Sequence, residues 1–365
     1  MQVELVAHTP LGSVSGIGRY AEELYHHLSN RVPTRIVRPI SPPLADRLTF
    51  LHQLPLGLRG HQPGSIVHFT QIMGCSQMLW HPVRPAIASV HDLGVLVCKE
   101  DEQLFNRFDR LILDFQLAGL RRMDHFIVHS NYTRDSMLAH LGVHEEQITV
   151  VPTWIDSDFF RPIAGSRQML SERYNVDFND GANNLLYIGS ELPRKNLGLL
   201  LEAVATLKAR GHKTRLVKIG SPGGDQWRAR LLLDIERLGL SDNVIFTGVI
   251  SDDDLVLFLN AADLCVTPSL LESTFAWVAL GAMACGRPSV VTSAALVPEE
   301  AQDAALVVPP RNLEMLVQAI EQCLQDVDLR RRMGEAGRQI IRSYRGESAI
   351  SAIIGAYQTL LHSVS

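Results

Sequence analysis

We expect an α/β fold made of two doubly wound domains, each built on a parallel β-sheet. Three observations predict it. Short apolar runs alternate with helical patterns along the whole chain, as in βαβ units. The chain has 365 residues and a hydrophobic content of 46%, which is enough for two cores. Between two such halves, residues 152–166 carry two prolines, a glycine and polar residues that interrupt any regular period.

The apolar runs predict the strands. In the first half they read VELVAH, SIVHF, AIASVHD and HFIVHS, at residues 3–8, 65–69, 86–92 and 125–130. In the second half they read LLYIGS, TRLVKIGS, NVIFTG, LCVTPS and PSVVTS, at residues 185–190, 214–221, 243–248, 264–269 and 288–293. Helical periods lie between them, for example in LGLLLEAVATLKARG at residues 197–211.

The domain boundaries follow from this order. We expect the first domain over residues 1–160 and the second over residues 161–345. The last helix, which starts around Ser348 and runs through AISAIIGAYQTLL, carries apolar residues on more than one face. A helix of this kind packs on more than its own domain, so we expect residues 346–365 to pack back toward the first domain.

Composition restricts the partners and the location. A formal net charge of -5 gives no broad basic surface, so we expect no nucleic-acid partner. The five cysteines show no Cys-x-x-Cys pairing, which favours a reducing compartment. The N-terminus lacks a signal-peptide pattern, and no uncharged stretch approaches the roughly 20 residues that span a bilayer. We therefore expect a cytoplasmic protein; the sequence does not indicate its oligomeric state.

Histidines are concentrated in the first half of the chain, where twelve of the fourteen precede residue 145. Pairs such as His26 with His27, or His140 with His144, lack a third ligand at a recognisable spacing. We expect no metal.

A glycine-containing segment, LGSVSGIGRY at residues 11–20, follows the first predicted strand and leads into a helix. Glycine allows the backbone to approach a ligand at a helix N-terminus, where unpaired N–H groups favour phosphate. The spacing of Gly12, Gly16 and Gly18 is not that of the dinucleotide fingerprint. A tight turn without a ligand is the alternative.

Two further segments follow predicted strands of the second half. Glu191 to Asn196 contain Arg194 and Lys195, which can hold a diphosphate and neutralise charge on a leaving nucleotide; the alternative is a solvated basic loop. Residues 268–288 contain a loop with Glu272, and then a helix that ends at Gly286. This loop can offer N–H groups to phosphate while Glu272 accepts hydrogen bonds from sugar hydroxyls. A solvent-facing glutamate is the alternative.

Taken together these segments resemble the retaining glycosyltransferase family four of the GT-B fold, and in particular its mannosyltransferase-like group 1 members. The resemblance runs through almost the whole chain in order. It is carried by GIGRY at 16–20, VHDL at 90–93, DHFIVHSN at 124–131, VVPTWID at 150–156, residues 187–196, TGVIS at 247–251, and PEEA at 298–301, together with the segment at 268–288.

The resemblance implies two Rossmann-like domains with an interdomain cleft, and the transfer of a hexose from GDP-mannose or a UDP-sugar to a glycan, lipid-linked or small-molecule acceptor. The nucleotide sugar is then a substrate, and no cofactor is expected. The implied catalytic residues are His91, Glu272 and Lys195. The implied donor-binding residues are Ser190, Arg194, Lys195, Asn196, Val249, Glu272, Ser273, Thr274, Phe275 and Gly281, and the implied glycine loop is Gly16, Ile17 and Gly18.

The sequence also departs from the family pattern. The second glutamate of the family motif, which binds the ribose, is replaced by Gly281, and eight residues separate it from Glu272. Ser273 holds the position that the strict spacing gives to glutamate, Trp154 stands at a turn where the family has glycine, and Ser190 stands where many relatives carry arginine. The alternative function is therefore a weak or inactive relative that binds a nucleotide sugar or serves as a partner subunit.

Membrane contact is a separate hypothesis. Residues 47–61, RLTFLHQLPLGLRGH, carry arginines, histidines and leucines and no acid, a composition that suits peripheral binding at the inner face of a membrane. Pro55 and Gly57 interrupt the segment, and an ordinary surface helix or loop is the favoured alternative.

Overall fold

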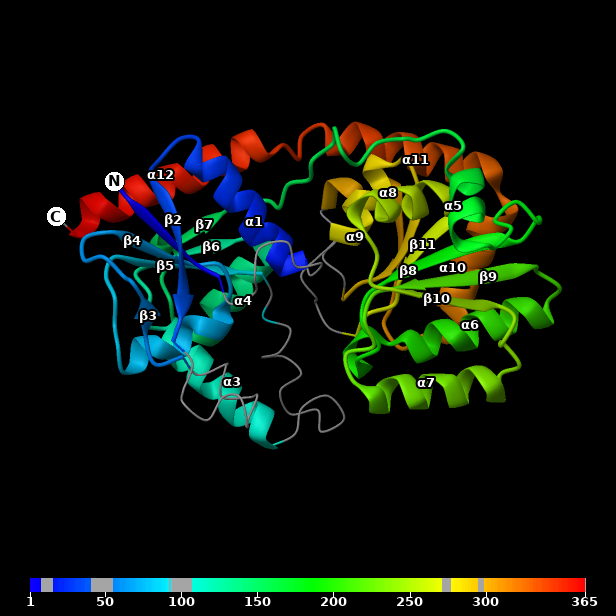
Figure 1. Ribbon diagram of the computed structural model, residues 1–365, viewed down its shortest axis with the longest axis horizontal. Coiled ribbons are helices and arrows are strands. Elements are labelled where there is room, and N and C mark those ends of the chain that lie inside the picture. The colour runs from blue at the N-terminus through cyan, green and yellow to red at the C-terminus, as the bar shows by residue number, and fades with distance from the viewer. Residues whose placement is uncertain are drawn as a thin grey trace. The chain divides into compact units, whose positions relative to one another are not determined.

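The computed structural model describes residues 1–7, 16–40, 55–91, 93, 107–270, 277–294 and 299–364. The chain forms two compact units (Figure 1). The first comprises Met1–Trp154 with Gly346–Ser365, and the second comprises Ile155–Arg345. The chain passes between units at Trp154, whereas the sequence-based boundary lies at residue 160.

The first unit is built on a sheet with the strand order β3-β2-β1-β4-β5-β6-β7. Neighbouring strands are parallel, except that β3 runs antiparallel to β2 at the edge. The strands are β1 (Val3–Val6), β2 (Thr34–Pro39), β3 (Leu58–Arg59), β4 (Ile66–Phe69), β5 (Ala86–Val90), β6 (His125–Val128) and β7 (Ile148–Val150). The carboxyl ends of the parallel strands therefore share one edge of this sheet.

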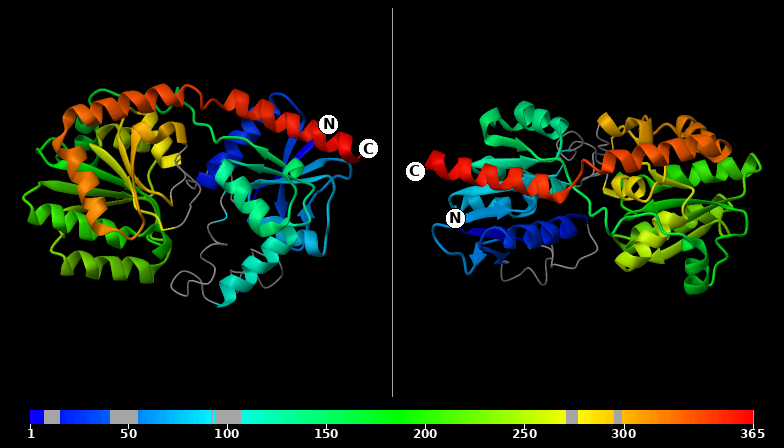
Figure 2. Two further views of the ribbon diagram at one scale, coloured as in Figure 1. Left: turned by 180° about the vertical axis from the view of Figure 1, so that it is seen from behind. Right: turned by 90° about the horizontal axis from the view of Figure 1, so that it is seen from above.

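Helices cover the sheet of the first unit. They are α1 (Gly16–Ser29), η2 (Ile72–Leu79), α3 (Arg107–Leu120), α4 (Asn131–Leu141), η3 (Glu145–Gln147) and α12 (Gly346–Val364). Ile350, Ile353 and Tyr357 of α12 are fully buried in a cluster that includes Leu5 and Ile66 of the sheet. Figure 2 shows α12, in red, running along this unit. The C-terminal helix thus belongs to the core of the N-terminal half.

The second unit has a sheet in which neighbouring strands are parallel, with the order β10-β9-β8-β11-β12-β13. The strands are β8 (Asn183–Ile188), β9 (Thr214–Ile219), β10 (Val244–Gly248), β11 (Leu264–Thr267), β12 (Ser289–Thr292) and β13 (Ala305–Val308). The strand order reverses direction between β8 and β11. In open sheets of this kind, ligands bind outside the carboxyl ends of the strands at that reversal.

Helices pack on both faces of the second sheet, so the doubly wound α/β prediction is confirmed. They are α5 (Ser166–Tyr174), η4 (Pro193–Lys195), α6 (Leu197–Ala209), α7 (Asp225–Arg237), α8 (Asp252–Ala261), α9 (Trp277–Ala284), η5 (Glu299–Ala304), α10 (Leu313–Gln325) and α11 (Val327–Ile341). One core cluster includes Phe258 of α8 and Met283 of α9, and another includes Leu200 of α6 and Ile320 of α10.

Each of the apolar runs named above contains a strand. Where the structure describes the ends, a run extends beyond its strand by one or two residues, as at Gly189 and Ser190 after β8, which lie outside the strand. The sequence interpretation missed β2, β3, β7 and β13. In β2, TRIVRP, arginines and a proline break the apolar run, and only Val37 is fully buried. The strands β3 and β7 are two and three residues long and half-buried or exposed. Burial of so little apolar surface leaves a weak pattern.

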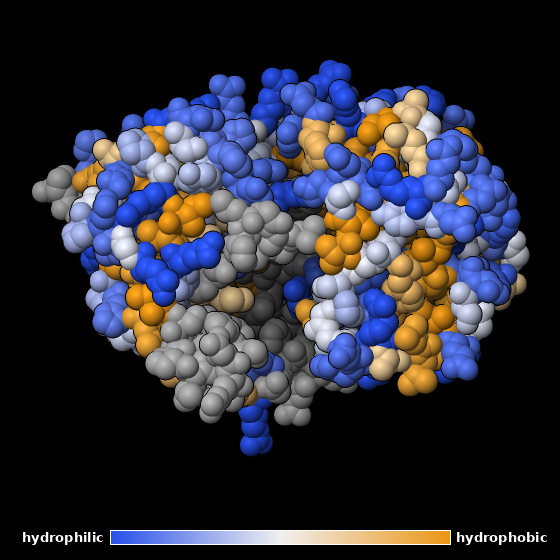
Figure 3. All heavy atoms as spheres, in the orientation of Figure 1, coloured by the Kyte–Doolittle hydropathy of each residue, from blue (hydrophilic) through white to orange (hydrophobic). Residues whose placement is uncertain are grey.

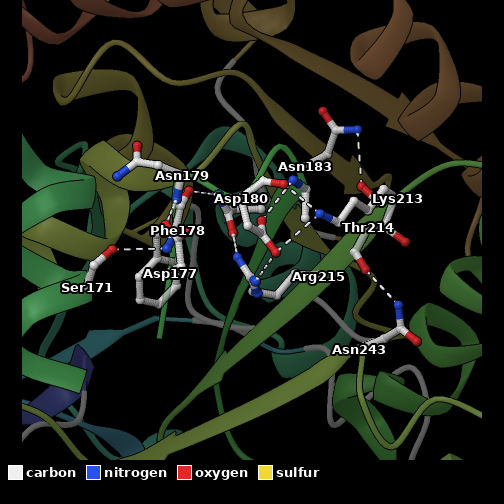
Figure 4. Close-up of polar contacts among 12 residues, drawn as sticks. Ser171, Asp177, Phe178, Asn179, Asp180, Asn183, Lys213, Thr214, Arg215 and Asn243 are labelled. Atoms are coloured by element: carbon white, nitrogen blue, oxygen red, sulfur yellow. Dashed lines mark hydrogen bonds and ion pairs between the residues drawn. The ribbon is translucent and has the colours of Figure 1, made fainter. Parts of the chain in front are cut away.

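The amino ends of β8 and β9 are held by an ion cluster around Asp180 (Figure 4). The guanidinium of Arg215 donates to the Asp180 carboxylate at 2.8 Å, and the ammonium of Lys213 donates to the Asp180 carbonyl at 2.5 Å. Burial raises the pKa of Asp180, but the backbone N–H of Ala182 and the Arg215 charge outweigh it and hold the pKa below its usual value. This edge of the sheet is thereby tied together away from the strands' carboxyl ends.

Within the described residues, no helix combines the length and the apolarity needed to cross a membrane. Figure 3 shows hydrophilic side chains over much of the described surface, with hydrophobic atoms over α7, where Leu232 and Leu233 are 48% and 67% exposed. Of the segment proposed for membrane contact, residues 47–54 lie outside the described residues. Leu58 and Arg59 form the edge strand β3.

Candidate active site

The turn after β8 carries the predicted phosphate-gripping cations. The N–H of Gly189 donates to the carbonyl of Ile219 at 2.9 Å, which ties the end of β8 to β9. Arg194 and Lys195 lie in the short helix η4, and Asn196 then adopts a left-handed conformation with φ of 55° before α6 begins. Asparagine tolerates this conformation better than most residues. Both cations therefore lie between a strand's carboxyl end and a helix N-terminus, a place that favours anions.

The turn after β8 is hydrogen-bonded to the loop after β11. The N–H of Leu270 donates to the carbonyl of Arg194 at 2.8 Å, and the side-chain amide of Asn196 donates to the carbonyl of Pro268 at 3.1 Å. The fold thus joins two motifs that lie about seventy residues apart in the sequence. They meet where the strand order reverses, so the sheet places both at its expected ligand-binding position.

The end of β10 lies at the same edge of the second sheet. The N–H of Gly220, directly after β9, donates to the carbonyl of Gly248 at 2.7 Å. Gly248 has φ of 71°, a conformation that favours glycine, and Val249 follows it with 55% of its surface exposed. Ser190 belongs to this edge as well, because its carbonyl accepts the hydroxyl of buried Tyr187 at 2.7 Å.

Gly281 lies in a different environment. It is buried on α9, and a Cβ atom there would lie 3.3 Å from Leu259, 3.8 Å from Phe160 and 3.9 Å from Ile155. The position therefore faces apolar side chains of the core. The remaining donor-binding residues of the sequence prediction, Glu272, Ser273, Thr274 and Phe275, lie outside the described residues.

The sequence interpretation missed a buried ion cluster beside the turn after β8. The side chains of Glu191 and Lys218 are fully buried, with Lys218 Nζ 2.9 Å from Glu191 Oε1. Arg228 of α7 donates from Nε to Glu191 Oε2 at 2.8 Å. Burial raises the pKa of Glu191, but hydrogen bonds from Arg228 and Lys218 outweigh it and hold the pKa below its usual value. In the sequence, the one indication of this cluster was a glutamate, a lysine and an arginine placed in or next to otherwise apolar segments.

His91 lies at the carboxyl end of β5 in the first unit. It is 9% exposed, and its Nε2 lies 2.8 Å from the carbonyl of Thr70. Because a carbonyl can only accept, Nε2 must carry the hydrogen, which leaves a lone pair on Nδ1 of the neutral ring. The ring stacks on His129 with centroids 4.8 Å apart, and Tyr20 packs perpendicular to it at 4.7 Å.

These histidines are neutral at physiological pH. Burial, and to a smaller extent the neighbouring His129, lowers the pKa of His91 to about 3. Burial lowers the pKa of His129 to about 4, and its Nδ1 donates to the carbonyl of Val151 at 2.9 Å. A histidine with so low a pKa accepts or donates hydrogen bonds but does not supply a charge near pH 7.

A chain of buried hydroxyls and a histidine connects α12 to this region. His68 is hydrogen-bonded through Nδ1 to the Tyr357 hydroxyl at 2.6 Å and through Nε2 to the Ser89 hydroxyl at 2.8 Å. The Ser89 hydroxyl also lies 2.7 Å from that of Tyr20. Tyr20 therefore links this chain to His91.

The predicted glycine loop is helical where it is described. Gly16, Ile17 and Gly18 form the first turn of α1. Gly18 is buried and precedes Tyr20 by two residues. Trp154, 2% exposed, packs beside Tyr20 with centroids 5.3 Å apart, so the tryptophan at the unusual turn is part of the core. Over the described part of the chain, no group of three or more His, Cys, Asp or Glu side chains is arranged to hold a metal ion.

Comparison with known families decides the assignment. The model described as "Glycosyl transferases group 1" matches residues 170–340, and the model described as "Glycosyltransferase Family 4" matches residues 16–159. The chain belongs to glycosyltransferase family 4. The two matches correspond to the second and first halves of the chain, so both halves support the assignment.

Curated members of this glycosyltransferase family resemble the chain over part of their length. It is 27% identical to the MMP alpha-(1->4)-mannosyltransferase of Mycolicibacterium hassiacum over 259 residues, 69% of this chain and 58% of that protein. It is 28% identical to the mannosylfructose-phosphate synthase of Agrobacterium fabrum over 223 residues, 57% of this chain and 48% of that protein. The matches thus span about half the length of these relatives.

A solved structure shows the same architecture. Sucrose-phosphate synthase from Thermosynechococcus elongatus superimposes with a TM-score of 0.79 at 22% identity, covering 100% of both chains. The glycosyltransferase therefore has the GT-B fold that its sequence resemblance implied.

Proposed function

We propose that this glycosyltransferase moves a hexose from a nucleotide diphosphate sugar to a glycan, lipid-linked or small-molecule acceptor, with retention of the anomeric configuration. The observation that carries the proposal is the hydrogen-bonded junction of the Arg194 turn with the loop after β11. That junction places two cations and a helix N-terminus at the strand-order reversal of the second sheet.

In this mechanism Arg194 and Lys195 bind the donor diphosphate and neutralise the charge that develops as the sugar bond breaks. The leaving phosphate helps to deprotonate the acceptor hydroxyl on the same face of the sugar. The protein contributes mainly positioning and electrostatic stabilisation. Ser190, Asn196 and Val249 line the donor site, and Glu272 contacts the transferred sugar, next to Ser273, Thr274 and Phe275.

We assign His91 an orienting role. Its low pKa makes it a poor source of a proton near pH 7, because the ring is neutral there. With Nε2 committed to the carbonyl of Thr70, Nδ1 has the lone pair to accept a hydrogen bond from a sugar hydroxyl.

We favour GDP-mannose as the donor, with UDP-sugars as the next candidates. Both curated relatives described above have names that refer to a mannosyl group. The turn Pro193 to Asn196 also resembles that of mannosyltransferase-like members. Because the nucleotide sugar is a substrate, the proposal requires no cofactor and no metal. We propose a cytoplasmic location. Peripheral contact with the inner face of the membrane is a further hypothesis, which sedimentation of the protein with lipid vesicles would test.

A second candidate function is a non-catalytic relative that binds a nucleotide sugar or serves as a partner subunit. Gly281 favours it, because the position has no carboxylate for the ribose and its Cβ direction faces the core. The loss of a charged hydrogen bond weakens binding by about 1.5–3 kcal/mol, which lowers activity without abolishing it. We therefore keep the transferase as the first candidate.

The test is a binding and turnover screen with purified protein. Calorimetry with GDP-mannose, UDP-glucose and ADP-glucose measures donor binding, and release of the nucleotide measures hydrolysis or transfer. We expect GDP-mannose to bind most tightly and to turn over, and NMR of the product anomer reports retention. Binding without turnover of any donor would favour the second candidate. Absence of donor binding would refute the transferase and the nucleotide-sugar-binding form of the second candidate.

A further inference from the structure

We propose that the buried cluster of Glu191, Lys218 and Arg228 positions the turn that carries Arg194 and Lys195. This inference rests on the proposed function, because it assigns a role to residues behind the donor-binding turn. Neither Glu191, Lys218 nor Arg228 is placed against the donor itself. They are positioning residues that act through the turn after β8 and the loop after β9.

The ammonium group of Lys218 is held by three hydrogen-bonding partners. It is the fifth residue of β9 and is fully buried. Its ammonium donates to the carbonyls of Gly220 at 2.7 Å and Ser221 at 3.0 Å, and lies 2.9 Å from Glu191 Oε1. An ammonium group has three donors, so each N–H has one partner. Lys218 therefore joins the loop after β9 to the turn after β8.

Glu191 is held by its backbone as well as by its carboxylate. Its N–H donates to the carbonyl of Pro222 at 3.1 Å, and Arg228 donates to both carboxylate oxygens, with Nε 2.8 Å from Oε2 and 3.1 Å from Oε1. Glu191 lies three residues before Arg194. Its fixed position therefore limits where the turn with Arg194 and Lys195 can lie.

Arg228 extends the connection to β10. Its guanidinium carbon lies 4.2 Å from the ring centroid of Phe246 on β10, two residues before Gly248. The carbonyl of Gly248 in turn accepts from Gly220. One cluster thus connects the carboxyl ends of β8, β9 and β10. Of the predicted donor contacts, Ser190, Arg194, Lys195 and Asn196 follow β8, and Val249 follows β10.

Stability alone is a poor explanation for this cluster. Removing charges from water costs several kcal/mol per ion, and apolar replacements of buried ion pairs are often as stable or more stable. What charged hydrogen bonds add is direction, because each has a preferred distance and angle. Two cations and one carboxylate also leave a net positive charge behind the proposed diphosphate site, which favours an anion there.

The experiment compares an apolar replacement of the buried pair with a matched change at the other end of the same sheet. In Glu191→Leu/Lys218→Met the two fully buried charges are replaced by apolar side chains of similar size. The remaining partner, Arg228, has a side chain that is 29% exposed, so water can solvate its charge and we expect the fold to be retained. Asp180→Asn alters the ion cluster at the amino ends of β8 and β9 and serves as the control. The probes are GDP and UDP, titrated calorimetrically, with melting temperatures measured in parallel.

We expect the double variant to melt near the wild-type temperature but to bind GDP or UDP about tenfold to a hundredfold more weakly, as when a mutation misplaces a binding group. In turnover assays the donor KM rises and kcat falls, while the acceptor KM is unchanged. Asp180→Asn leaves all these constants within about twofold, because it touches none of the donor loops. Arg228→Lys keeps the charge but loses the two-pronged contact, so its effect is intermediate.

The outcomes separate the inference from the proposed function. If wild-type protein binds neither GDP nor UDP, the proposed function fails, and the inference fails with it. If wild-type protein binds and the stable double variant binds equally well, only the positioning role is refuted. Should the double variant not fold, Arg228→Lys and Arg228→Met decide, since the Arg228 side chain is 29% exposed and tolerates change. Unchanged affinity for GDP and UDP in both would overturn the inference.

Discussion

The carboxyl edges of the two sheets differ in their electrostatics. At the edge of the second sheet, Arg194 and Lys195 lie in a turn backed by the charged cluster of Glu191 and Lys218. At the edge of the first sheet, the described histidines are neutral: His91 and His129 stack on each other and donate to backbone carbonyls. Burial acts on both edges, but among the described residues it is the cluster of the second edge that has the charged partners needed to keep its ions.

The difference follows the chemistry of the proposed ligands. A diphosphate requires cations, whereas an acceptor or sugar hydroxyl requires neutral donors and acceptors of hydrogen bonds. In the first unit, Tyr20 and its aromatic neighbours exclude water and lower the pKa of the histidines. In the second, hydrogen bonds to Glu191 keep its carboxylate charged despite burial. Two sheets of the same class thus differ in charge at the described parts of their carboxyl edges.

The largest expected effect is a loss of stability of the first unit in acid, where its neutral histidines become protonated. Burial lowers the pKa of His68 and His91 to about 3 in the fold, against 6.5 for an ordinary histidine. Below pH 6.5 the unfolded chain therefore binds protons that the folded chain does not. Each of these two histidines lowers the free energy of unfolding by up to about 1.4 kcal/mol per pH unit as the pH falls below that value.

Hydrogen exchange resolved by unit measures this effect, because the two units need not unfold together. From pH 7 to pH 5, after correction for the intrinsic exchange rate, amides of β4, β5 and α12 should lose protection. Amides of β8 and β9 should keep it, since His212 is the one histidine that the structure describes in the second unit. Equal loss in both units would show that the buried histidines are not the cause.

A second change introduces charge where the second unit is apolar. Gly281→Glu restores a carboxylate at the family position, but its Cβ would lie 3.3 Å from Leu259 and close to Phe160. We expect a loss of about 3 kcal/mol or more in the free energy of unfolding, because the carboxylate enters the core unpaired. Gly281→Ala is the control; its methyl meets the flexible end of a leucine and gains helix propensity, so the net change is small. Tighter GDP binding by the glutamate variant, without loss of stability, would show instead that the position reaches the ribose.

The third prediction tests the cationic edge through activity. Lys195→Ala removes a cation that faces the leaving diphosphate in the proposed mechanism, so kcat/KM should fall at least about tenfold, or about 1.4 kcal/mol. Lys213→Ala removes a lysine of the same sheet that bonds to Asp180 at its amino end, and should leave kcat/KM unchanged. Steady-state kinetics of both variants decides. Equal kinetics for Lys195→Ala and the wild type would remove Lys195 from the donor site.

Sequence reasoning identified the fold because the central strands are continuous apolar runs. It missed β2 and β7 because their side chains are only half-buried and their runs are short or interrupted. It also grouped Gly16, Ile17 and Gly18 as a loop, whereas they form the first turn of α1. Helix boundaries depend on capping contacts that a glycine-rich segment does not specify.

The sequence predicts candidate site residues only where they are adjacent along the chain. Arg194, Lys195 and Asn196 form one segment after an apparent strand, and the structure places them at the strand-order reversal. The cluster of Glu191, Lys218 and Arg228 comes from a turn, a strand and a helix. A single buried lysine within TRLVKIGS carries no sequence signal for its partners, because those depend on strand order and tertiary packing.

The smallest expected effect concerns how firmly α12 supports the neutral edge. Tyr357→Phe removes the hydroxyl that lies 2.6 Å from His68 Nδ1 and leaves the apolar packing of the ring in place. Because His68 is fully buried, the lost hydrogen bond should lower the free energy of unfolding of the first unit by about 1 kcal/mol. Thr359→Val, on a solvent-exposed part of the same helix, is the control, since Thr359 bonds only within α12. Hydrogen exchange of β4 and α12 should show the difference, and donor affinity, which belongs to the other unit, should not change. Weaker donor binding in Tyr357→Phe would contradict this prediction and would mean that the two edges are coupled.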